Sequence, residues 1–482
     1  MENMIGRVKE LKMLREYIGS SKSEFIAVYG RRRVGKTFLI RAAAKDTFAF
    51  YMTGSNDSSF ERQLLNFSLA LQKHSKSEEL LIYKSWIVAF HSLGHYLETL
   101  PSGPKVVFID EMPWLDTPRS GFIHALENFW NSWAVLRDDV KLIVCGSATS
   151  WMLNNLIHNR GGLHNRLTHH ILLEPFSLNE CEEYFKCHGF GYSRMEIAEC
   201  YMILGGIPFY LSLMQKKMSL AQNIDNLFFS STAELKDEFK NLYKAIFKKA
   251  THHIAIVTAL SRKRMGMTRR ELLHITGFDD NGAFSTVLEE LIQCGFIRQY
   301  EPYVEKAKPT RRNANKKSLY QLIDFYTLFY FNFIEGNIYN DEHFWSTSAN
   351  SPLHNAWAGL AFEMLCLHHI RQIKQALGIA GVQTRVCSWR TSKEASKGAQ
   401  IDLLIDRKDE TINVCEIKYT KGEFAITKQY SQELQDKINL FQEETGTRKS
   451  LLLTLITTNG LKPNEYTAIP QCAVELEQLF LP

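Results

Sequence analysis

Three apolar runs alternate with helical stretches in the first part of the chain. They are FIAVYG at 25–30, KVVFIDE at 105–111 and KLIVCGS at 141–147. Their apolar residues follow one another without polar alternation, which is typical of strands that are buried on both faces of a parallel sheet. Residues 1–205 are therefore expected to form an α/β domain around such a sheet.

The pattern becomes mostly helical between residues 206 and 334. Within 268–300, two apolar-periodic helices are broken at Gly277-Phe278-Asp279-Asp280. The segments FIRQY and SLYQLID can then pair as a β-hairpin around the loop at 302–317. This arrangement predicts a helical lid followed by a winged helix, and the aromatic stretch FYTLFYFNF at 325–333 is expected to anchor the interdomain core.

A second α/β pattern occupies residues 335–482. The polar stretch 335–352 is interpreted as a linker, and a helix is expected at 354–376. Four strands should follow, in TRVCSW, AQIDLLIDR, TINVCEIKY and SLLLTLITT. The chain is thus expected to hold three parts with the boundaries 1–205, 206–334 and 335–482.

The composition is that of an ordinary globular protein. Of the 482 residues, 45% are hydrophobic and 23% charged, which excludes disorder as the dominant state. The net charge of +5 permits an anionic partner without requiring one. No run approaches the ~20 apolar residues of a membrane span, the N-terminus lacks the apolar core of a signal peptide, and the nine cysteines are scattered singly. A cytoplasmic protein without a membrane partner is expected.

A phosphate-binding loop follows the first predicted strand. GRRRVGKT at 30–37 fits GxxxxGK[ST] and opens a predicted helix, so backbone N–H groups and the helix N-terminus can wrap phosphate oxygens. Lys36 is expected to reach the β- and γ-phosphates, and Thr37 to hold Mg²⁺. The residues expected to bind the nucleotide are Gly30, Arg31, Arg32, Arg33, Val34, Gly35, Lys36, Thr37 and Phe38.

Two carboxylates end the second predicted strand. Asp110 is placed to hold Mg²⁺ through water and to complete the nucleotide site, and Glu111 is placed to orient or deprotonate the attacking water. Alone, two acids at the end of a buried strand could be simple caps. Beside a phosphate loop they predict hydrolysis of the nucleotide.

Several motifs in residues 1–215 resemble those of the archaeal-type ATPases, members of the wider AAA+/STAND group. The similar motifs are Gly6-Arg7 with Glu10, GRRRVGKT, VVFIDEMPWL, KLIVCGSATSWM and GGIPFYL at 205–211. The resemblance implies ATP as the nucleotide, Ser147 as a polar sensor in the nucleotide site, and Arg166 as an arginine finger that could act within an oligomer. Asn165 stands where the family has glycine, and a solvated or ion-paired Arg166 is the alternative.

Basic residues gather in the predicted winged helix. One cluster lies between Arg262 and Arg270 and another between Arg298 and Lys317. Such a surface suits DNA, because each neutralised phosphate releases counterions. The alternative is that the winged helix packs as a lid between domains and its charges are merely solvated.

Three carboxylates and a lysine are expected to meet in the C-terminal domain. Glu363 lies on a predicted helix, Asp402 on one strand, and Glu416 with Lys418 on the next, two residues apart and so on one face. Such a set could hold one or two divalent ions, Mg²⁺ or Mn²⁺, and Lys418 could position or activate a water for attack on a phosphodiester.

This ordered set resembles the PD-(D/E)xK nuclease superfamily. It is also similar to a nuclease-like domain that commonly follows archaeal-type ATPases, including YQLIDF at 320–325. The leading hypothesis is therefore an ATP-regulated protein that acts on DNA. The alternative is a STAND-type regulatory switch whose C-terminal fold only binds DNA or protein.

Overall fold

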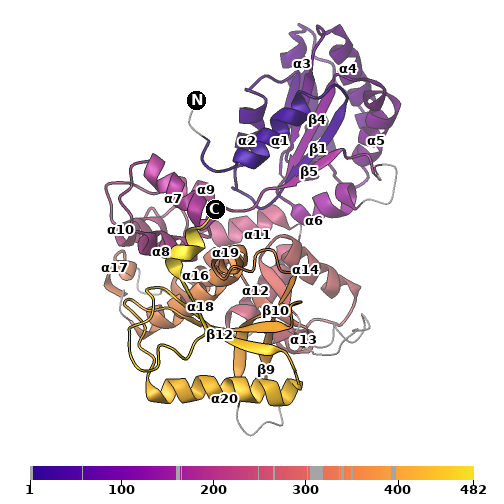
Figure 1. The fold of residues 1–482 in the computed structure, drawn as a ribbon. Helices are drawn as coiled ribbons and strands as arrows, with labels where there is room; N and C mark the ends of the chain where they lie inside the picture. Colours follow the sequence, from indigo (N-terminus) through magenta and orange to yellow (C-terminus); the bar gives the residue numbers. More distant parts are fainter. Residues whose placement is uncertain are drawn as a thin grey trace. The chain divides into compact units, whose positions relative to one another are not determined.

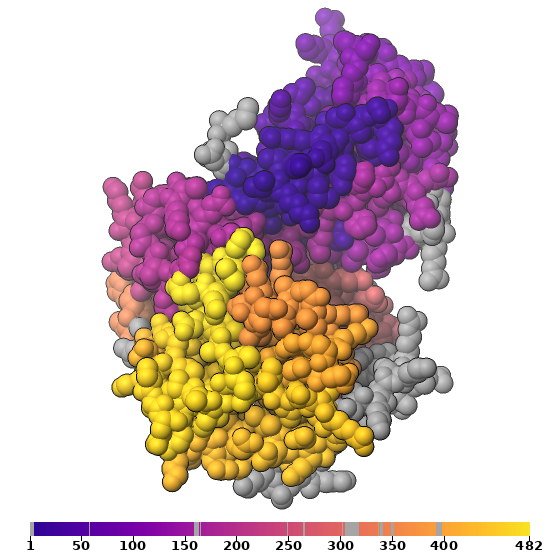
Figure 2. All heavy atoms as spheres, viewed as in Figure 1, coloured from indigo at the N-terminus to yellow at the C-terminus, as the bar shows by residue number. Residues whose placement is uncertain are grey.

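The structure is a computed structural model of the 482-residue chain (Figure 1 and Figure 2). It describes residues 4–56, 58–158, 163, 165–247, 249–263, 266–300, 302–303, 318–335, 337, 341–348, 351–391 and 398–482. The chain divides into two units. Unit 1 comprises Met1–Pro175, Ile207–Phe209 and Asn241–Ala250, and unit 2 comprises Phe176–Gly206, Tyr210–Lys240 and Thr251–Pro482.

Unit 1 is built around a parallel sheet. Its strands are β1 (Glu24–Tyr29), β2 (Phe50–Thr53), β3 (Lys105–Asp110), β4 (Val140–Gly146) and β5 (His169–Leu172). Its main helices are α1 (Val8–Ile18), α2 (Lys36–Ala43), α3 (Phe60–Ser75), α4 (Trp86–Thr99), α5 (Phe122–Ser132) and α6 (Thr149–Met152). The three apolar runs of this region form β1, β3 and β4, which confirms the predicted parallel α/β sheet.

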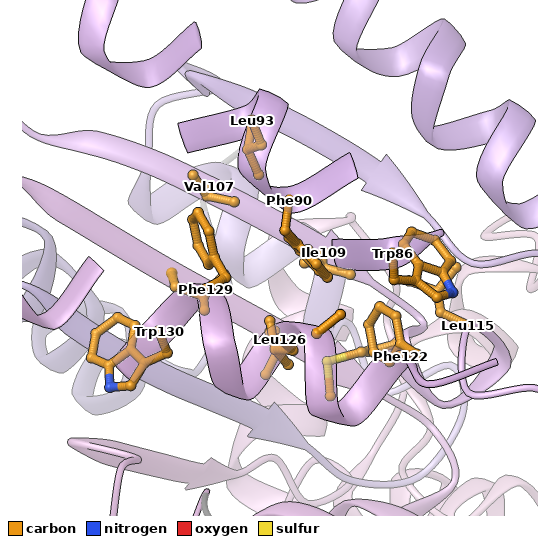
Figure 3. Packing of buried hydrophobic residues seen from close by; sticks show 14 of the residues in the cluster. Trp86, Phe90, Leu93, Val107, Ile109, Leu115, Phe122, Leu126, Phe129 and Trp130 are labelled. Atoms are coloured by element: carbon orange, nitrogen blue, oxygen red, sulfur yellow. The ribbon is translucent and has the colours of Figure 1, made fainter. Parts of the chain in front are cut away.

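The strand order is β2-β3-β4-β1-β5, and every pairing is parallel. Residues of β1 are buried on both faces, which explains the absence of polar alternation. Its alternate residues Phe25, Ala27 and Tyr29 belong to the core cluster that α3, α4 and α5 close. Figure 3 shows the aromatic part of this cluster, where Trp86, Phe90, Phe122 and Phe129 pack beside Val107 and Ile109 of β3.

Unit 2 begins with helices that follow β5. These are α7 (Leu178–Cys187), α8 (Arg194–Leu204) and α10 (Leu220–Ile224), while α9 (Pro208–Ser212) and α11 (Glu238–Ile246) each contain residues of both units. Ser177 and Ser193 cap α7 and α8 in capping boxes with Glu180 and Glu196, which satisfies the first backbone N–H groups of both helices.

A small sheet with three helices occupies the middle of unit 2. The helices are α12 (Ala250–Ser261), α13 (Arg269–Thr276) and α14 (Gly282–Gln293), and the strands are β6 (Met267–Thr268), β7 (Ile297–Tyr300) and β8 (Leu319–Leu322). The helices break where expected, at Gly277, whose φ is +69°. The predicted hairpin is confirmed by the antiparallel pairing of β7 and β8.

The C-terminal part of unit 2 holds a five-stranded mixed sheet of order β13-β12-β11-β10-β9. Its strands are β9 (Thr384–Arg390), β10 (Gln400–Arg407), β11 (Thr411–Lys418), β12 (Ser450–Thr457) and β13 (Cys472–Glu475). Helices α18 (Pro352–His368), α19 (Ile370–Ala376) and α20 (Lys428–Thr445) accompany it. The four expected strands are present, while the expected helix at 354–376 is interrupted at His369.

Aromatic residues of the stretch 325–333 are buried within unit 2. Helix α16 (Phe325–Phe329) and the π-helical turn η5 (Tyr330–Ile334) bury Tyr326, Phe329 and Phe333. The interpretation of 335–352 as a linker is wrong at α17 (Phe344–Ser348), where Trp345 is buried and its backbone N–H donates to Asp225. A large aromatic residue within a polar stretch was the signal that this segment packs.

The final turn of the chain, η6 (Leu476–Phe480), packs against α7 and α19 within unit 2. Arg194 of α8 bonds both Glu182 and Glu477, and its guanidinium lies 4.9 Å from the ring centre of Phe480. In addition, the backbone N–H of Leu178 donates to Nε2 of His369 at 3.1 Å. Helices α7 and α8 are thereby joined to the C-terminal part of the same unit.

No helix in the described ranges combines the length and the hydropathy that a bilayer crossing requires. The nine cysteines are free thiols, and all except Cys187 and Cys472 are buried.

Gly206 offers a test of the packing at the start of unit 2. Its φ is +64°, and a Cβ there would lie 2.4 Å from the carbonyl oxygen of Phe176 and 2.6 Å from the Tyr201 ring. We expect Gly206→Ala to cost about 2–3 kcal/mol and to lower the melting temperature of this unit by roughly 4–10 °C. Differential scanning calorimetry checks this, with Gly282→Ala as the control because nothing lies near that position. Equal melting of both variants would contradict the packing argument.

Candidate functional site: a phosphate loop and a C-terminal charged cluster

The strand order of unit 1 brings three functional segments to one edge of the sheet. Strand β4 lies between β1 and β3, and all three are parallel. The phosphate loop follows β1, Asp110 and Glu111 end β3, and Ser147 follows β4. Because the carboxyl ends of parallel strands meet at the same edge, these segments converge although up to 117 residues separate them in sequence.

The phosphate loop depends on two glycines with positive φ. Gly30 has φ +141°, and a Cβ there would lie 2.2 Å from the carbonyl oxygen of Leu173. Gly35 has φ +93° and precedes α2, which begins at Lys36. These backbone conformations leave the amide groups of the loop and of the first turn of α2 available to a phosphate.

Lys36 is buried at the centre of this edge. Its ammonium donates to the carbonyl oxygens of Gly30 and Arg31, both at 2.9 Å, and to Oγ of Ser147 at 3.0 Å. Burial lowers the pKa of Lys36, and the nearby acidic groups of Glu111, Cys145 and Asp110 partly oppose this effect.

Asp110 faces the first turn of α2. Its Oδ2 accepts from Oγ1 of Thr37 at 2.9 Å, and its Oδ1 accepts from the backbone N–H of Glu111 at 2.9 Å and from the thiol of Cys145. Burial raises the pKa of Asp110 above its ordinary value. Carboxylate and hydroxyl oxygens at this spacing fit the hard-cation chemistry of Mg²⁺. Sequence reasoning missed Cys145, whose one signal was its place on the strand beside Asp110.

Glu111 is joined to Lys36 through Ser147. Ser147 donates from Oγ to Oε1 of Glu111 at 2.6 Å and from its backbone N–H to Oε2 at 3.1 Å. Since Ser147 also accepts from Lys36, the three residues form one hydrogen-bonded chain. Glu111 has φ +46°, an uncommon conformation for a residue other than glycine, and this conformation turns it away from the strand direction.

Two of the other predicted motifs also contact this part of unit 1. Phe209 of the GGIPFYL segment packs under the guanidinium of Arg33 at 4.3 Å, and its backbone N–H donates to the Arg33 carbonyl at 3.4 Å. Arg7 of the N-terminal motif is buried and donates to the carbonyl oxygen of Glu174. Arg31, Arg32 and Val34 lie in the loop, and Phe38 is half exposed on α2.

Arg166 is not brought to this site. It is exposed and lies two residues before Thr168, whose backbone N–H bonds Phe25 near the start of β1. The loop lies beyond the other end of β1, a strand of six residues that spans about 20 Å. Arg166 and the phosphate loop of the same chain therefore lie at opposite ends of the sheet.

The C-terminal carboxylates lie on three neighbouring elements. Leu403 of β10 pairs with Cys415 of β11, and this is the last pair of the two antiparallel strands. Asp402 precedes Leu403 and Glu416 follows Cys415, so both acids lie directly beyond this last pair. Helix α18, which carries Glu363, packs against β11. The predicted order of elements is thus present, and it brings the acidic residues to one region of the sheet.

Both carboxylate oxygens of Glu416 are bonded to lysine ammonium groups, and one of them also accepts from a tyrosine hydroxyl. Its Oε1 lies 3.1 Å from Nζ of Lys418 and accepts from the Tyr430 hydroxyl at 2.9 Å, while its Oε2 lies 2.7 Å from Nζ of Lys437. Burial raises the pKa of Glu416, but Lys437 and then Lys418 outweigh it, and the net pKa is lowered. Sequence reasoning missed Lys437 and Tyr430, because nothing in the pattern of α20 marks the face that reaches β11.

Arg298 of β7 interacts electrostatically with the other two carboxylates, Asp402 and Glu363. It bonds Oε1 of Gln321 on β8, and its guanidinium lies 4.7 Å from the Tyr300 ring centre. Burial lowers its pKa, and the charges of Asp402 and Glu363 act against that shift. Asp402 also accepts from the Gln400 side chain.

The carboxylates do not form a metal cluster in this arrangement. Within the described ranges, no three His, Cys, Asp or Glu side chains are grouped so that they could hold a metal ion. The donor types suit a divalent cation, but Glu416 is ion-paired with lysines.

Two of the expected basic residues are paired with carboxylates of the same region. Lys263 pairs with Glu271 at 2.6 Å, and Arg269 pairs with Asp280 at 2.7 Å. Arg262 and Arg270 are exposed. The remaining expected residues of the hairpin loop, between 304 and 317, lie outside the described residues.

Comparison with known proteins finds a family model that matches the N-terminal part of the chain. Residues 4–214 match the family model described as "ATPase domain predominantly from Archaea". An uncharacterized protein of Methanocaldococcus jannaschii is 24% identical over 443 residues, covering 90% of this chain and 92% of the relative.

Two solved structures are similar at lower levels. The Walker-type ATPase of Pyrococcus abyssi has 18% identity and a TM-score of 0.47, covering 68% of this chain and 96% of that chain. The ORC2 protein of Aeropyrum pernix has 14% identity and a TM-score of 0.38, covering 69% and 95%. At these scores neither likeness bears on function. The family match and the loop geometry together identify residues 4–214 as an archaeal-type P-loop ATPase domain.

Proposed function

We propose that this chain hydrolyses ATP and uses the cycle to control an action of its unit 2 on DNA. The hydrogen-bonded chain Lys36–Ser147–Glu111 is the single observation that carries the ATP part. It joins the group expected to bind the γ-phosphate to the group expected to act on the attacking water. A nucleotide that draws the Lys36 ammonium onto its phosphates would break the bond from Lys36 to Ser147, while the two hydrogen bonds from Ser147 would continue to orient Glu111 for its role as base.

Thr37 and Asp110 are the residues that would hold Mg²⁺ with the nucleotide. Their oxygens lie 2.9 Å apart, and Asp110 is kept in place by a backbone N–H and a thiol. Bound Mg²⁺ supplies charge neutralisation on the phosphate oxygens. The chain's own part is to orient those oxygens, while Lys36 and the loop amides bind the phosphates.

The middle of unit 2 supports a winged helix. Helices α13 and α14 are followed by the antiparallel strands β7 and β8, and β6 pairs with β8 to close the small sheet. The exposed Arg262 and Arg270 lie on either side of Lys263 and Arg269, which are ion-paired. DNA contact by this element is proposed from that layout and from the basic sequence of the hairpin loop.

The C-terminal sheet supports a nuclease-like domain of the PD-(D/E)xK type. Helix α18 precedes the antiparallel meander β9-β10-β11, and α20 connects β11 to the parallel strand β12. Glu363, Asp402, Glu416 and Lys418 fall on the expected elements of this layout. We propose Lys418 as the residue that positions a water for attack on a phosphodiester.

A regulatory switch without DNA cleavage is the second candidate. The observation that favours it is the pairing of Glu416 with two lysines, together with the lack of a three-residue metal group within the described ranges. In that case unit 2 would bind DNA or a protein under the control of ATP.

The hydrolysis proposal is tested by Glu111→Gln and Ser147→Ala. We expect Glu111→Gln to bind ATP as the wild type does but to hydrolyse it about 100-fold more slowly or worse, because the base is lost. Ser147→Ala should lower kcat by roughly tenfold or more, because Glu111 loses both its orienting hydroxyl and its link to Lys36. Phosphate release and calorimetric ATP binding measure the two effects. Glu127→Gln on α5 is the control, and unchanged turnover in Glu111→Gln would refute the assignment.

The position of Arg166 supports action on a neighbouring copy rather than within its own chain. We expect Arg166→Ala and Lys36→Ala each to lose at least about 100-fold in ATP turnover. A mixture of the two variants should regain part of the activity, because a wild-type loop can then meet a wild-type arginine. Steady-state turnover of the mixture checks this, and a mixture as inactive as its components would exclude the arginine-finger role in trans.

Cleavage separates the two candidate functions. We expect the wild type to cut plasmid or single-stranded DNA with Mg²⁺ or Mn²⁺, and Lys418→Ala to lose this activity about 100-fold or more because the water is no longer positioned. Lys36→Ala tests whether ATP gates the reaction. The exposed Lys408→Ala in the β10–β11 turn is the control. Intact ATP hydrolysis without any cleavage would favour the regulatory switch.

A further inference from the structure

Two side chains of helix α20, Tyr430 and Lys437, contact the same residue, Glu416. Tyr430 and Lys437 are seven residues apart, which places them two turns apart on one face of the helix. Both reach Glu416 on β11, the phenol at 2.9 Å and the ammonium at 2.7 Å. The opposite face of α20 is exposed, since its buried residues are Leu434 and Phe441, and the helix lies on the yellow surface in Figure 2.

The cluster around Glu416 carries an excess of positive charge. One carboxylate faces two ammonium groups, so Glu416, Lys418 and Lys437 together bear a net charge of +1. The side chains of Lys418 and Lys437 are 33% and 23% exposed, while that of Glu416 is 14% exposed. The two cations therefore form the outer part of the cluster and the carboxylate its inner part.

The geometry leaves both lysines able to bind a further anion. Each ammonium has three N–H donors, and Glu416 accepts one from each. Glu416 thereby holds the two cations on either side of its own two oxygens. Phosphate oxygens can accept from more than one ammonium group, and a compact ammonium is a common phosphate-binding group.

We propose that Lys437 binds a phosphate of the DNA backbone in the C-terminal site, beside the water-positioning Lys418. This inference rests on the proposed DNA-directed function and adds to it a contact that does not require cleavage. Tyr430 takes no phosphate in this arrangement, because its hydroxyl proton is directed at Glu416. Its role is to keep Glu416 between the two lysines.

The test is DNA binding by the full chain in the presence of a chelator, so that no divalent ion contributes. Fluorescence anisotropy of a labelled duplex is measured between about 50 and 300 mM salt for the wild type and Lys437→Gln. We expect Lys437→Gln to bind roughly three- to tenfold more weakly, with a log–log salt slope that is less steep by about 1. Lys437→Arg should keep the wild-type slope, since the charge is retained.

Two controls separate a phosphate contact from a disturbed cluster. Tyr430→Phe removes a hydrogen bond to Glu416 and keeps both charges, so its slope should equal that of the wild type. Lys408→Gln removes an exposed lysine far along the same strand pair from Glu416, and it should also leave the slope unchanged. A wild-type slope in Lys437→Gln would overturn the inference alone. A wild type that does not bind DNA would overturn the proposed DNA function and this inference with it.

Discussion

The buried ammonium of Lys36 is the constraint on which the nucleotide site depends. A cation so far from solvent must be satisfied by protein oxygens, and here two loop carbonyls and the Ser147 hydroxyl do this. The same hydroxyl also binds Glu111, so the electrostatic needs of one side chain fix the position of another. A phosphate that satisfies Lys36 changes both at once. The residue proposed to bind phosphate and the residue proposed to act as base are in this way joined through a single serine that follows β4.

Much of the fold could be predicted from the sequence because its patterns are local. Buried parallel strands lack polar alternation, and the strands β1, β3 and β4 were recognised on that basis. The short edge strands β2, β5 and β13 have four residues each and too little pattern to be recognised. The break at His369 was equally invisible, because its role is to accept a hydrogen bond from Leu178, 191 residues away.

The candidate sites also differ in whether their residues belong to a local sequence motif. The residues of the phosphate loop have fixed spacing, so Lys36 and Thr37 could be named from the sequence. Lys437 of α20 and Arg298 of β7 interact with the C-terminal carboxylates from other elements, and no sequence motif predicts such contacts. They change the expected chemistry most, because they convert an anionic cluster into a largely charge-balanced one. Local motifs identify the acids, whereas their counter-charges depend on tertiary structure.

The contact between α8 and the final turn of the chain has a consequence for the order of folding. Arg194 and Glu477 are 283 residues apart, and Phe480 covers the same guanidinium. During synthesis, unit 1 has all of its sheet strands by residue 172 and can collapse early. Helices α7 and α8 emerge next, yet part of their packing surface is supplied by η6, which is made 283 residues after Arg194 at the Glu477 contact. That surface of α7 and α8 stays uncovered until η6 has been synthesised, so the packing of unit 2 depends on a contact of high sequence separation, which is slow to form.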